Sequence, residues 1–264
     1  MVHQLSLFDS VDDDSYDLLI STLTILSGNS PVLFSNLTQA WKPNEAYDID
    51  RVNSKNQLVQ LNRAKLSKEI PLKSFRRSDG SETFSHTLLK DLANMDLPLE
   101  PNILDAFFND TMSSGSNDSN TAWALKMSDI PAAGSSRKVS AQTISESVIL
   151  STAGENSSLA SFLRELGYIE SYQYITVGVK FLMKNDLVIT VEKIWDIGRK
   201  RQITNGGFLV KAFVNVTRGT DIDRINQAES TLLAFQKDMQ GYIDLTIPDR
   251  QAMDPRLDYV SDNL

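Results

Sequence analysis

The sequence predicts a mainly β protein with flanking helices (α+β), built on a many-stranded antiparallel β-barrel. Residues 168–184, 187–197 and 207–217 each alternate apolar and polar side chains, which is the pattern of strands with one buried face. An Asn-Asp pair separates the first two stretches and an Asn-Gly-Gly run precedes the third, and both are typical hairpin turns. The first stretch, at about 17 residues, is longer than a usual strand. We therefore expect it to bend at Gly178, as it would in a closed barrel.

The rest of the chain is less regular but carries further elements. Predicted helices end in glycine or begin with acidic residues, and their apolar residues recur every three or four positions. The signal at 86–94 is weak. Further strands are predicted at 4–8, 32–41, 122–130 and 139–150, and helices at 14–26, 86–94, 157–167 and 221–240.

The chain is expected to form one domain over residues 1–264. With 264 residues, of which 41% are hydrophobic, it can bury an ample core. Residues 109–120 contain a single apolar side chain, which is too little to offset the entropy lost on ordering. Because strand-like patterns resume on both sides, we interpret this stretch as a flexible loop within the domain. The polar tail from about Asp249 is also expected to be loose.

Composition excludes several classes of function. The chain has no cysteine, so it forms no disulfide, thiolate zinc site or cysteine nucleophile. No apolar run approaches the roughly 20 residues of a membrane helix, and we expect no membrane contact. The net charge of −8 opposes binding to DNA phosphates, so we expect no direct sequence-specific DNA binding. A protein partner fits this composition better.

The junction at residues 218–223 is the most suggestive short motif. A glycine-containing turn enters a helix that begins with Asp221 and Asp223, where a phosphate or a metal would find a helix N-terminus. Thr220, however, stands at the N-cap position with Asp223 three residues on, as in a capping box. Neither G-x-G-x-x-G nor G-x-x-x-x-G-K-[ST] occurs. We therefore predict a helix cap at Thr220 and no phosphate site.

Searches for catalytic or metal-binding motifs give nothing stronger. His3 lies in a terminal strand and His86 in a polar segment, and neither has H-E-x-x-H spacing. No G-x-S-x-G motif exists. Asp48 and Asp50 lie in a polar, loop-like stretch. The sequence thus predicts no catalytic, cofactor-binding or metal-binding residue and no cofactor.

Two basic clusters remain, at Arg76-Arg77 and at Arg199, Lys200 and Arg201. The second falls at the tip between two long strands, where charged residues commonly keep strand ends soluble and unpaired. Contact with an acidic partner or with a nucleic-acid backbone is the alternative, which the negative net charge weakens.

Longer segments of the chain resemble a known family. QLSLF, YDLLISTLT, WKPNEAYD, VNSKNQLV, KLSKEIP, SDIPAAG, QYITVGVKF, NGGFLVKAFVNVTRGTDIDRIN and QGYIDLTIPDRQAMD are similar to the subunit 18 family of the Mediator complex in budding yeasts. The resemblance runs from Gln4 to about Asp254 and is densest over 168–254. It departs around 109–120, where the yeast proteins carry a longer polar insertion.

The resemblance implies a many-stranded antiparallel barrel with flanking helices. It also implies a non-catalytic nuclear protein of the Mediator head module, a coactivator assembly that links transcription regulators to RNA polymerase II. The implied partners are a related barrel, Mediator subunit 20, and a C-terminal helical segment of Mediator subunit 8. The family offers no catalytic residues to transfer, and no short motif defines which residues of this chain contact a partner.

The competing hypothesis is a tunnel-type, metal-dependent RNA triphosphatase-like barrel. Such barrels hold their metal with alternating glutamates, which gives E-x-E on a strand. This chain contains no E-x-E, and Glu192 shares its strand face with Thr190 and Ile194. Metal-dependent phosphate chemistry needs more carboxylates than that.

A nucleic-acid binder would need a basic surface with aromatic platforms. Tyr168, Tyr172 and Tyr174 are predicted to share one strand face and could stack bases. Because the protein is acidic, barrel packing or a protein-binding face is the preferred interpretation.

Overall fold

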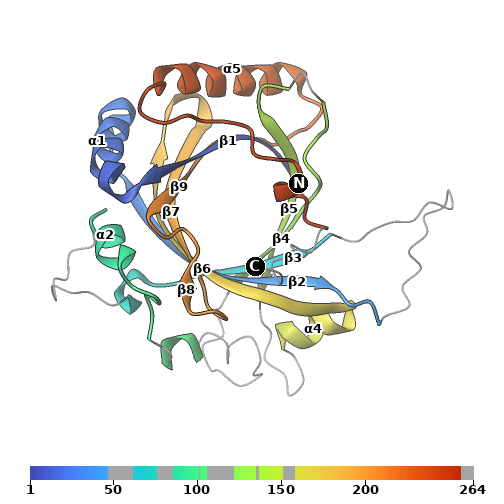
Figure 1. The fold of residues 1–264 in the computed structure, drawn as a ribbon. Coiled ribbons are helices and arrows are strands. Elements are labelled where there is room, and N and C mark those ends of the chain that lie inside the picture. The colour runs from blue at the N-terminus through green and yellow to red at the C-terminus, as the bar shows by residue number, and fades with distance from the viewer. Residues whose placement is uncertain are drawn as a thin grey trace.

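The structure, a computed structural model, describes residues 1–46, 62–75, 86–100, 102–105, 122–134, 137–150 and 158–256. The described strands form one antiparallel sheet that curls into a closed barrel, seen end-on in Figure 1, which confirms the predicted fold class. The strands are β1 (Val2–Asp12), β2 (Val32–Pro43), β3 (Ala64–Glu69), β4 (Ala122–Ser128), β5 (Ser140–Leu150), β6 (Tyr168–Leu182), β7 (Leu187–Asp196), β8 (Arg201–Gln202) and β9 (Gly207–Val216).

Closure of the barrel depends on the pairing of β6 with β7. The order around the sheet is β6-β2-β3-β4-β5-β1-β9-β7, and the additional β6–β7 pairing joins the two ends. Eight strands thus form the ring, and β8 pairs only with the far end of β7. The longest interface joins β2 to β6, from Val32 opposite Lys180 to Pro43 opposite Tyr168.

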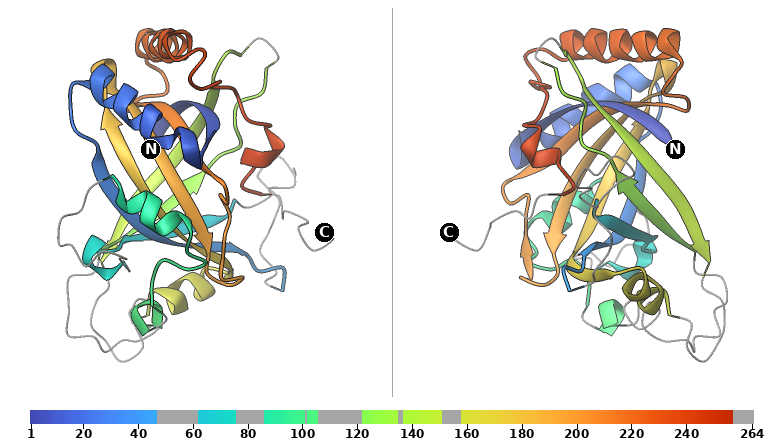
Figure 2. Two further views of the ribbon diagram at one scale, coloured as in Figure 1. Left: turned by 60° about the vertical axis from the view of Figure 1, so that its left-hand side comes forward. Right: turned by 90° about the vertical axis from the view of Figure 1, so that its right-hand side faces the viewer.

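Alternation along the strands places apolar side chains on the outer face of the ring. The helices are α1 (Tyr16–Ser27), α2 (Leu88–Ala93), α4 (Leu159–Glu165) and α5 (Ile222–Asp238). They lie outside the ring of strands in the end-on view of Figure 1, and both side views of Figure 2 show α5 above the strands. Leu23 of α1 and Leu232 of α5 are fully buried against this face. The hydrophobic core therefore lies between barrel and helices. No helix in the described part is long and apolar enough to span a membrane.

Local sequence signals account for the ends of these helices. Gly28 adopts a φ of 68° after α1, and its N–H donates to the Thr24 carbonyl oxygen, as expected for a glycine at a helix C-terminus. Ser158 caps α4, where its hydroxyl accepts from the Ser161 N–H at 3.0 Å.

The predicted elements are present, and two strands were missed. The strands and helices proposed above correspond to observed ones, including the weakly predicted α2. The missed β3 reads AKLSKE, six residues with three charges and little alternation, and β8 has only two residues. Both are recognisable only through the neighbours with which they pair.

Glycine at position 178 is explained by close packing, and the expected bend there stays a prediction. The pairing of β6 passes through Gly178 without a shift, opposite Phe34 on one side and Glu192 on the other. A Cβ at this position would lie 2.6 Å from Phe34 Cζ and 2.9 Å from Glu192 Cβ. The prediction of a bend at this residue therefore finds no support in the register.

The pairing of β6 becomes irregular near the start of the strand, at Ser171. Ala40 pairs with Tyr172 and Trp41 pairs with Glu170, so Ser171 is an extra residue, as in a β-bulge. Because of the bulge, the residues of β6 before Ser171 face the side of the sheet opposite to the one that unbroken alternation predicts. Tyr168 consequently lies on the outer face, whereas Tyr172 and Tyr174 face the lumen with their ring centroids 6.0 Å apart. The prediction that the three tyrosines share one face is wrong for Tyr168.

The chain after Asp249 is attached to the barrel up to Arg256, although we expected it to be loose. Arg250 Nε donates to the Pro131 carbonyl oxygen at 2.9 Å, and the Arg63 N–H donates to the Pro255 carbonyl oxygen at 3.3 Å. These two contacts are made to the connection between β4 and β5 and to the residue before β3, and polarity alone does not reveal them. The remaining tail and the predicted loop at 109–120 lie outside the described residues.

Replacing Gly178 by alanine should destabilise the barrel by about 1–3 kcal/mol, because the new methyl group overlaps Phe34 and the Glu192 stem. The free energy of unfolding in urea measures the effect. Gly198→Ala is the matched control: its Cβ meets only Asp196 Oδ1, at 3.4 Å, and the change should stay within about 0.5 kcal/mol. Equal effects at both positions would contradict the close-packing explanation.

Candidate functional site

The junction between β9 and α5 is a helix cap. The Asp221 carboxylate accepts from the Arg224 N–H at 3.1 Å, so the N-cap is Asp221 and the prediction of Thr220 is off by one residue. Asp223 lies in the first turn, where a carboxylate complements the helix dipole. One oxygen of the Asp221 carboxylate is thus engaged in capping the helix.

The two histidines lie in different parts of the fold. His3 belongs to β1, opposite Val216, and burial together with the nearby Arg137 charge lowers its pKa. His86 precedes α2 and accepts a hydrogen bond from the Tyr16 hydroxyl through its backbone oxygen at 3.0 Å. Within the described residues, no three His, Asp or Glu side chains are grouped as metal ligands. Four predicted loop residues lie outside the described ranges: Asp48, Asp50, Arg76 and Arg77.

The lumen of the barrel is polar, in contrast to its outer face. Lys65 of β3, Lys126 of β4 and Lys211 of β9 interact electrostatically although their strands lie on opposite walls. Only side chains that point into the ring can do so. The buried polar residues of the same face are Gln4, Ser6, Thr38, Thr176 and Thr190.

Lys211 is the centre of the lumen cluster. Its Nζ donates to Gln4 Oε1 at 2.7 Å and lies 5.4 Å and 4.9 Å from the ring centroids of Phe8 and Phe213. Burial lowers the pKa of Lys211, and the neighbouring Glu192 carboxylate opposes that shift. The cluster keeps this amine in place with an acceptor, an acid and two aromatic faces.

Glu192 occupies β7 as the sequence indicates, with Thr190 and Ile194 on the same face. Burial raises the pKa of Glu192 from 4.5 to about 7, and the Lys211 charge lowers it in part. Its cross-strand neighbours are Gly178 and Leu209. A single carboxylate flanked by a glycine and a leucine, with a lysine charge nearby, differs from the paired carboxylates that hold a divalent cation.

A second lysine of the lumen faces the tyrosine pair on β6. Lys65 forms a hydrogen bond with the Tyr174 hydroxyl. The electrostatic interaction with the Tyr174 phenolate raises the pKa of Lys65 more than burial lowers it. Lys126 forms an ion pair of 3.5 Å with Glu146 across β4 and β5. Sequence reasoning missed this group because alternation reveals which residues share a face, but not which face is the inner one.

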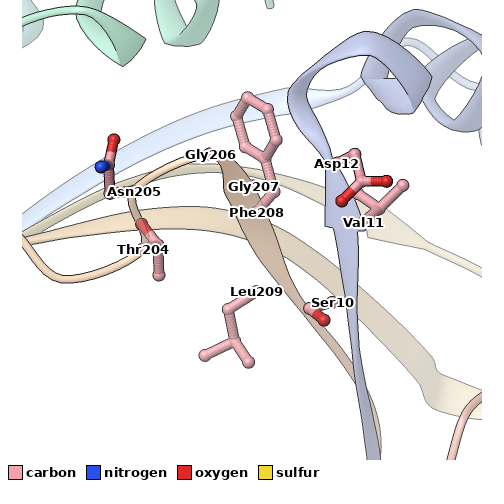
Figure 3. A pocket seen from close by; sticks show the side chains of 9 residues that line it. All are labelled: Ser10, Val11, Asp12, Thr204, Asn205, Gly206, Gly207, Phe208 and Leu209. Carbon is pink, nitrogen blue, oxygen red and sulfur yellow. The ribbon is translucent and has the colours of Figure 1, made fainter.

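A fully buried lysine on the outer face supports the wall beside a hollow of about 240 Å³ (Figure 3). Lys193 Nζ donates to Asp13 Oδ1 at 2.7 Å and to the Gly207 oxygen at 2.9 Å, and it lies 4.3 Å from the Phe208 ring centroid. The charge ties the end of β1 to the turn before β9. The hollow is lined by Ser10, Val11, Asp12, Thr204, Asn205, Gly206, Gly207, Phe208 and Leu209.

The basic tip predicted at 199–201 divides into three environments. Arg199 approaches the Asp196 carboxylate at 3.9 Å, and its N–H bonds the same side chain at 3.0 Å. Lys200 has a φ of 50° and forms the turn. Arg201 belongs to β8 and lines a separate hollow of about 610 Å³.

The outer surface of the protein exposes several apolar side chains on helix α1. On α1, the side opposite the core exposes Leu18, Ile25 and Leu26 by 60%, 80% and 51%. A helix that is apolar on both sides is unusual at a water-exposed surface. Contiguous exposed apolar residues of this kind commonly mark protein contacts.

These features define a class of protein: a closed antiparallel barrel with a polar lumen, covered outside by helices. The described residues show ion pairs and packing within the lumen, and uncovered apolar side chains on the outside. Such a molecule is suited to contact other proteins through its surface.

Comparison with known proteins agrees with this class and narrows it. A family described as Med18 protein matches residues 3–256, and the chain belongs to this family. Mediator of RNA polymerase II transcription subunit 18 of Saccharomyces cerevisiae is 45% identical over 300 residues, covering 97% of this chain and 98% of that protein. The Kluyveromyces lactis protein of the same name is 44% identical over 98% of this chain and all of its own length.

A solved structure shares the fold at much lower sequence identity. A chain in the structure of the Schizosaccharomyces pombe Mediator head module superposes with a TM-score of 0.58 and 12% identity, over 93% of this chain and 98% of that one. The barrel and its outer helices are therefore retained where little of the sequence is.

Glu192→Gln should change how stability depends on pH. Because folding raises the pKa of this acid, the folded state binds more protons than the unfolded state between pH 4.5 and about 7. The contribution of Glu192 to the free energy of unfolding therefore becomes less favourable as pH rises through that window. Glu192→Gln should lose at least about 1 kcal/mol less stability than wild type over the same range.

The measurement is the free energy of unfolding in urea at several pH values from 4.5 to 7.5. Glu146→Gln is the control, since that lumen carboxylate is half-exposed at the Lys126 ion pair. If wild type and Glu192→Gln run parallel over the whole range, Glu192 is not buried in the way described.

Proposed function

We propose that this protein is a non-catalytic subunit of the Mediator head module, which acts in the nucleus and links transcription regulators to RNA polymerase II through protein–protein contacts. Family membership over residues 3–256 is the observation that carries the proposal. Relatives that match nearly end to end bear the name of a Mediator subunit.

The physical character of the molecule supports contact as its mode of action. The lumen side chains described above already interact with one another, and Glu192 has Lys211 as its charged partner. The outer surface, in contrast, exposes apolar groups on α1 at a cost that binding to another protein would remove. The net charge of −8 is consistent with a protein partner and opposes a nucleic-acid one.

For its partners we propose the related barrel, Mediator subunit 20, and a C-terminal helical segment of Mediator subunit 8. A helical segment binds by placing its apolar face in a hydrophobic groove. A stable pairing of two barrels should bury on the order of 1,600 Å² or more. Contact with the RNA polymerase II machinery, direct or through these subunits, follows from the same proposal.

Coexpression with subunit 20 and the C-terminal segment of subunit 8 from the same organism should give a stoichiometric complex of three chains. Association on this scale should survive gel filtration at micromolar concentration. Circular dichroism of each purified chain serves as the control for folding. Separate elution of three folded chains would refute the assembly and with it the head-module assignment.

The alternative function, metal-dependent hydrolysis of RNA triphosphate ends, is addressed by a second experiment. The protein is incubated with labelled triphosphate-ended RNA and with nucleotides, in magnesium and in manganese. We expect no phosphate release above background, because Glu192 lies near the Lys211 charge and has no neighbouring glutamate on its strand face. Metal-dependent release that copurifies with the protein and is lost in Glu192→Gln would establish an enzyme instead.

A further inference from the structure

A hollow of about 610 Å³ lies outside the barrel, between the end of α2 and β8. One wall is the chain leaving α2 and the other is β8 with the turn that follows it. Trp195 fixes the two walls relative to each other, since its indole Nε1 donates to the Met95 carbonyl oxygen at 2.9 Å. The lining residues are Ala93, Asn94, Met95, Asp96, Arg201, Gln202, Ile203 and Asn205.

Gln202 is an unusual residue for this position. It pairs with Trp195, so its side chain shares the outer face and is directed toward the end of α2. Its amide oxygen and nitrogen are both buried without a hydrogen-bond partner. Burying an unpaired amide is destabilising, and such groups are rare in native proteins. Among the described residues, buried side-chain polar atoms without a hydrogen-bond partner occur in Gln39, Trp41 and Gln202. Only Gln202 lines one of the two hollows described above.

The neighbouring strand has an open side. β8 pairs with β7 and ends the order of the described sheet, so its other edge adjoins no described strand. An extended peptide can add to such an edge through main-chain hydrogen bonds. A primary amide that offers one acceptor and two donors matches the C=O and N–H groups of that peptide.

The charge on this wall selects the kind of peptide. Arg201 lines the hollow and forms no ion pair with any described residue, whereas Arg199 beside it is engaged with Asp196. Arg201 pairs with Asp196, so its side chain lies on the other face of β8 from Gln202 and is exposed. There its guanidinium can bind a carboxylate of a peptide added at this edge, with two parallel hydrogen bonds. Asp96 on the opposite wall favours a neutral or hydrogen-bond-donating side chain on that side.

We propose that the hollow between α2 and β8 binds an extended, acidic segment of a partner protein. The edge of β8 and the Gln202 amide bind its main chain, and Arg201 binds one of its carboxylates. The identification of this segment as part of another Mediator subunit rests on the function proposed above. The ability of the hollow to bind such a peptide is independent of that function.

The probe is a pentapeptide of alternating valine and glutamate, acetylated and amidated at its ends, titrated at millimolar concentration into the full ¹⁵N-labelled protein. Backbone amide resonances at 93–96 and 201–205 should shift. The same peptide with alternate N-methylated bonds should bind about tenfold more weakly, because it lacks the main-chain donors. A valine–lysine peptide should shift neither segment, and inorganic phosphate should not reproduce the shifts.

Two pairs of variants test the residues. Gln202→Leu should weaken binding about tenfold while the thermal midpoint stays the same or rises, because no internal hydrogen bond is lost. Gln39→Leu removes another buried, unpaired amide, on β2, and should leave binding unchanged. Arg201→Gln should weaken binding of the glutamate peptide by a similar factor, whereas Arg199→Gln should not.

Absence of shifts at both segments would overturn the proposal, as would equal binding of the N-methylated peptide or of phosphate. An unchanged affinity in Gln202→Leu would remove the assigned role of the amide. No Mediator subunit takes part in this experiment. If the three chains fail to assemble but the peptide binds, only the proposed function is refuted. If the three chains assemble but the peptide does not bind, only the peptide-binding role of the hollow is refuted.

Discussion

The pairing of β6 with β7 is the interaction on which the rest of the fold depends. Until the two ends of the sheet meet, β6 and β7 each present a row of unpaired backbone groups. Closure satisfies them and fixes the ring. Because the apolar face then points outward, it can be removed from water only by additional elements, and α1, α2, α4 and α5 supply that cover. The helices are thus required by the direction in which the sheet curls.

The same choice of face explains the charges inside the protein. A lumen lined by polar groups needs internal partners, and Lys211 finds them in Gln4, Glu192 and two aromatic rings. On the outer face, the fully buried Lys193 is bonded to a carboxylate and to backbone oxygens. Both arrangements follow the rule that a buried charge must be paired.

The sequence predicts the elements of this fold well and their environments less well. Alternation in β6, β7 and β9, together with the Asn-Asp and Asn-Gly-Gly turns, predicts the hairpins, because these are local properties of the chain. The facing of Tyr168 depends on a bulge at Ser171 that no local signal marks. The hollow beside Gln202 depends on α2 meeting β8 across about 100 residues of chain, joined by the Trp195–Met95 hydrogen bond. Glu192 was identified as solitary, but its lysine partner lies on another strand.

The position of β1 has a consequence for how the protein folds during its synthesis. The first strand of the chain pairs with β5 on one side and β9 on the other, and Gln4 is hydrogen-bonded to Asn215, 211 positions away. On the ribosome, β1 and β2 emerge long before β6 and β9 exist. Contacts of such separation form slowly, and strand edges stay exposed in the meantime. The N-terminal strands therefore stay without their partners during synthesis, and the barrel can close only once β9 has been translated.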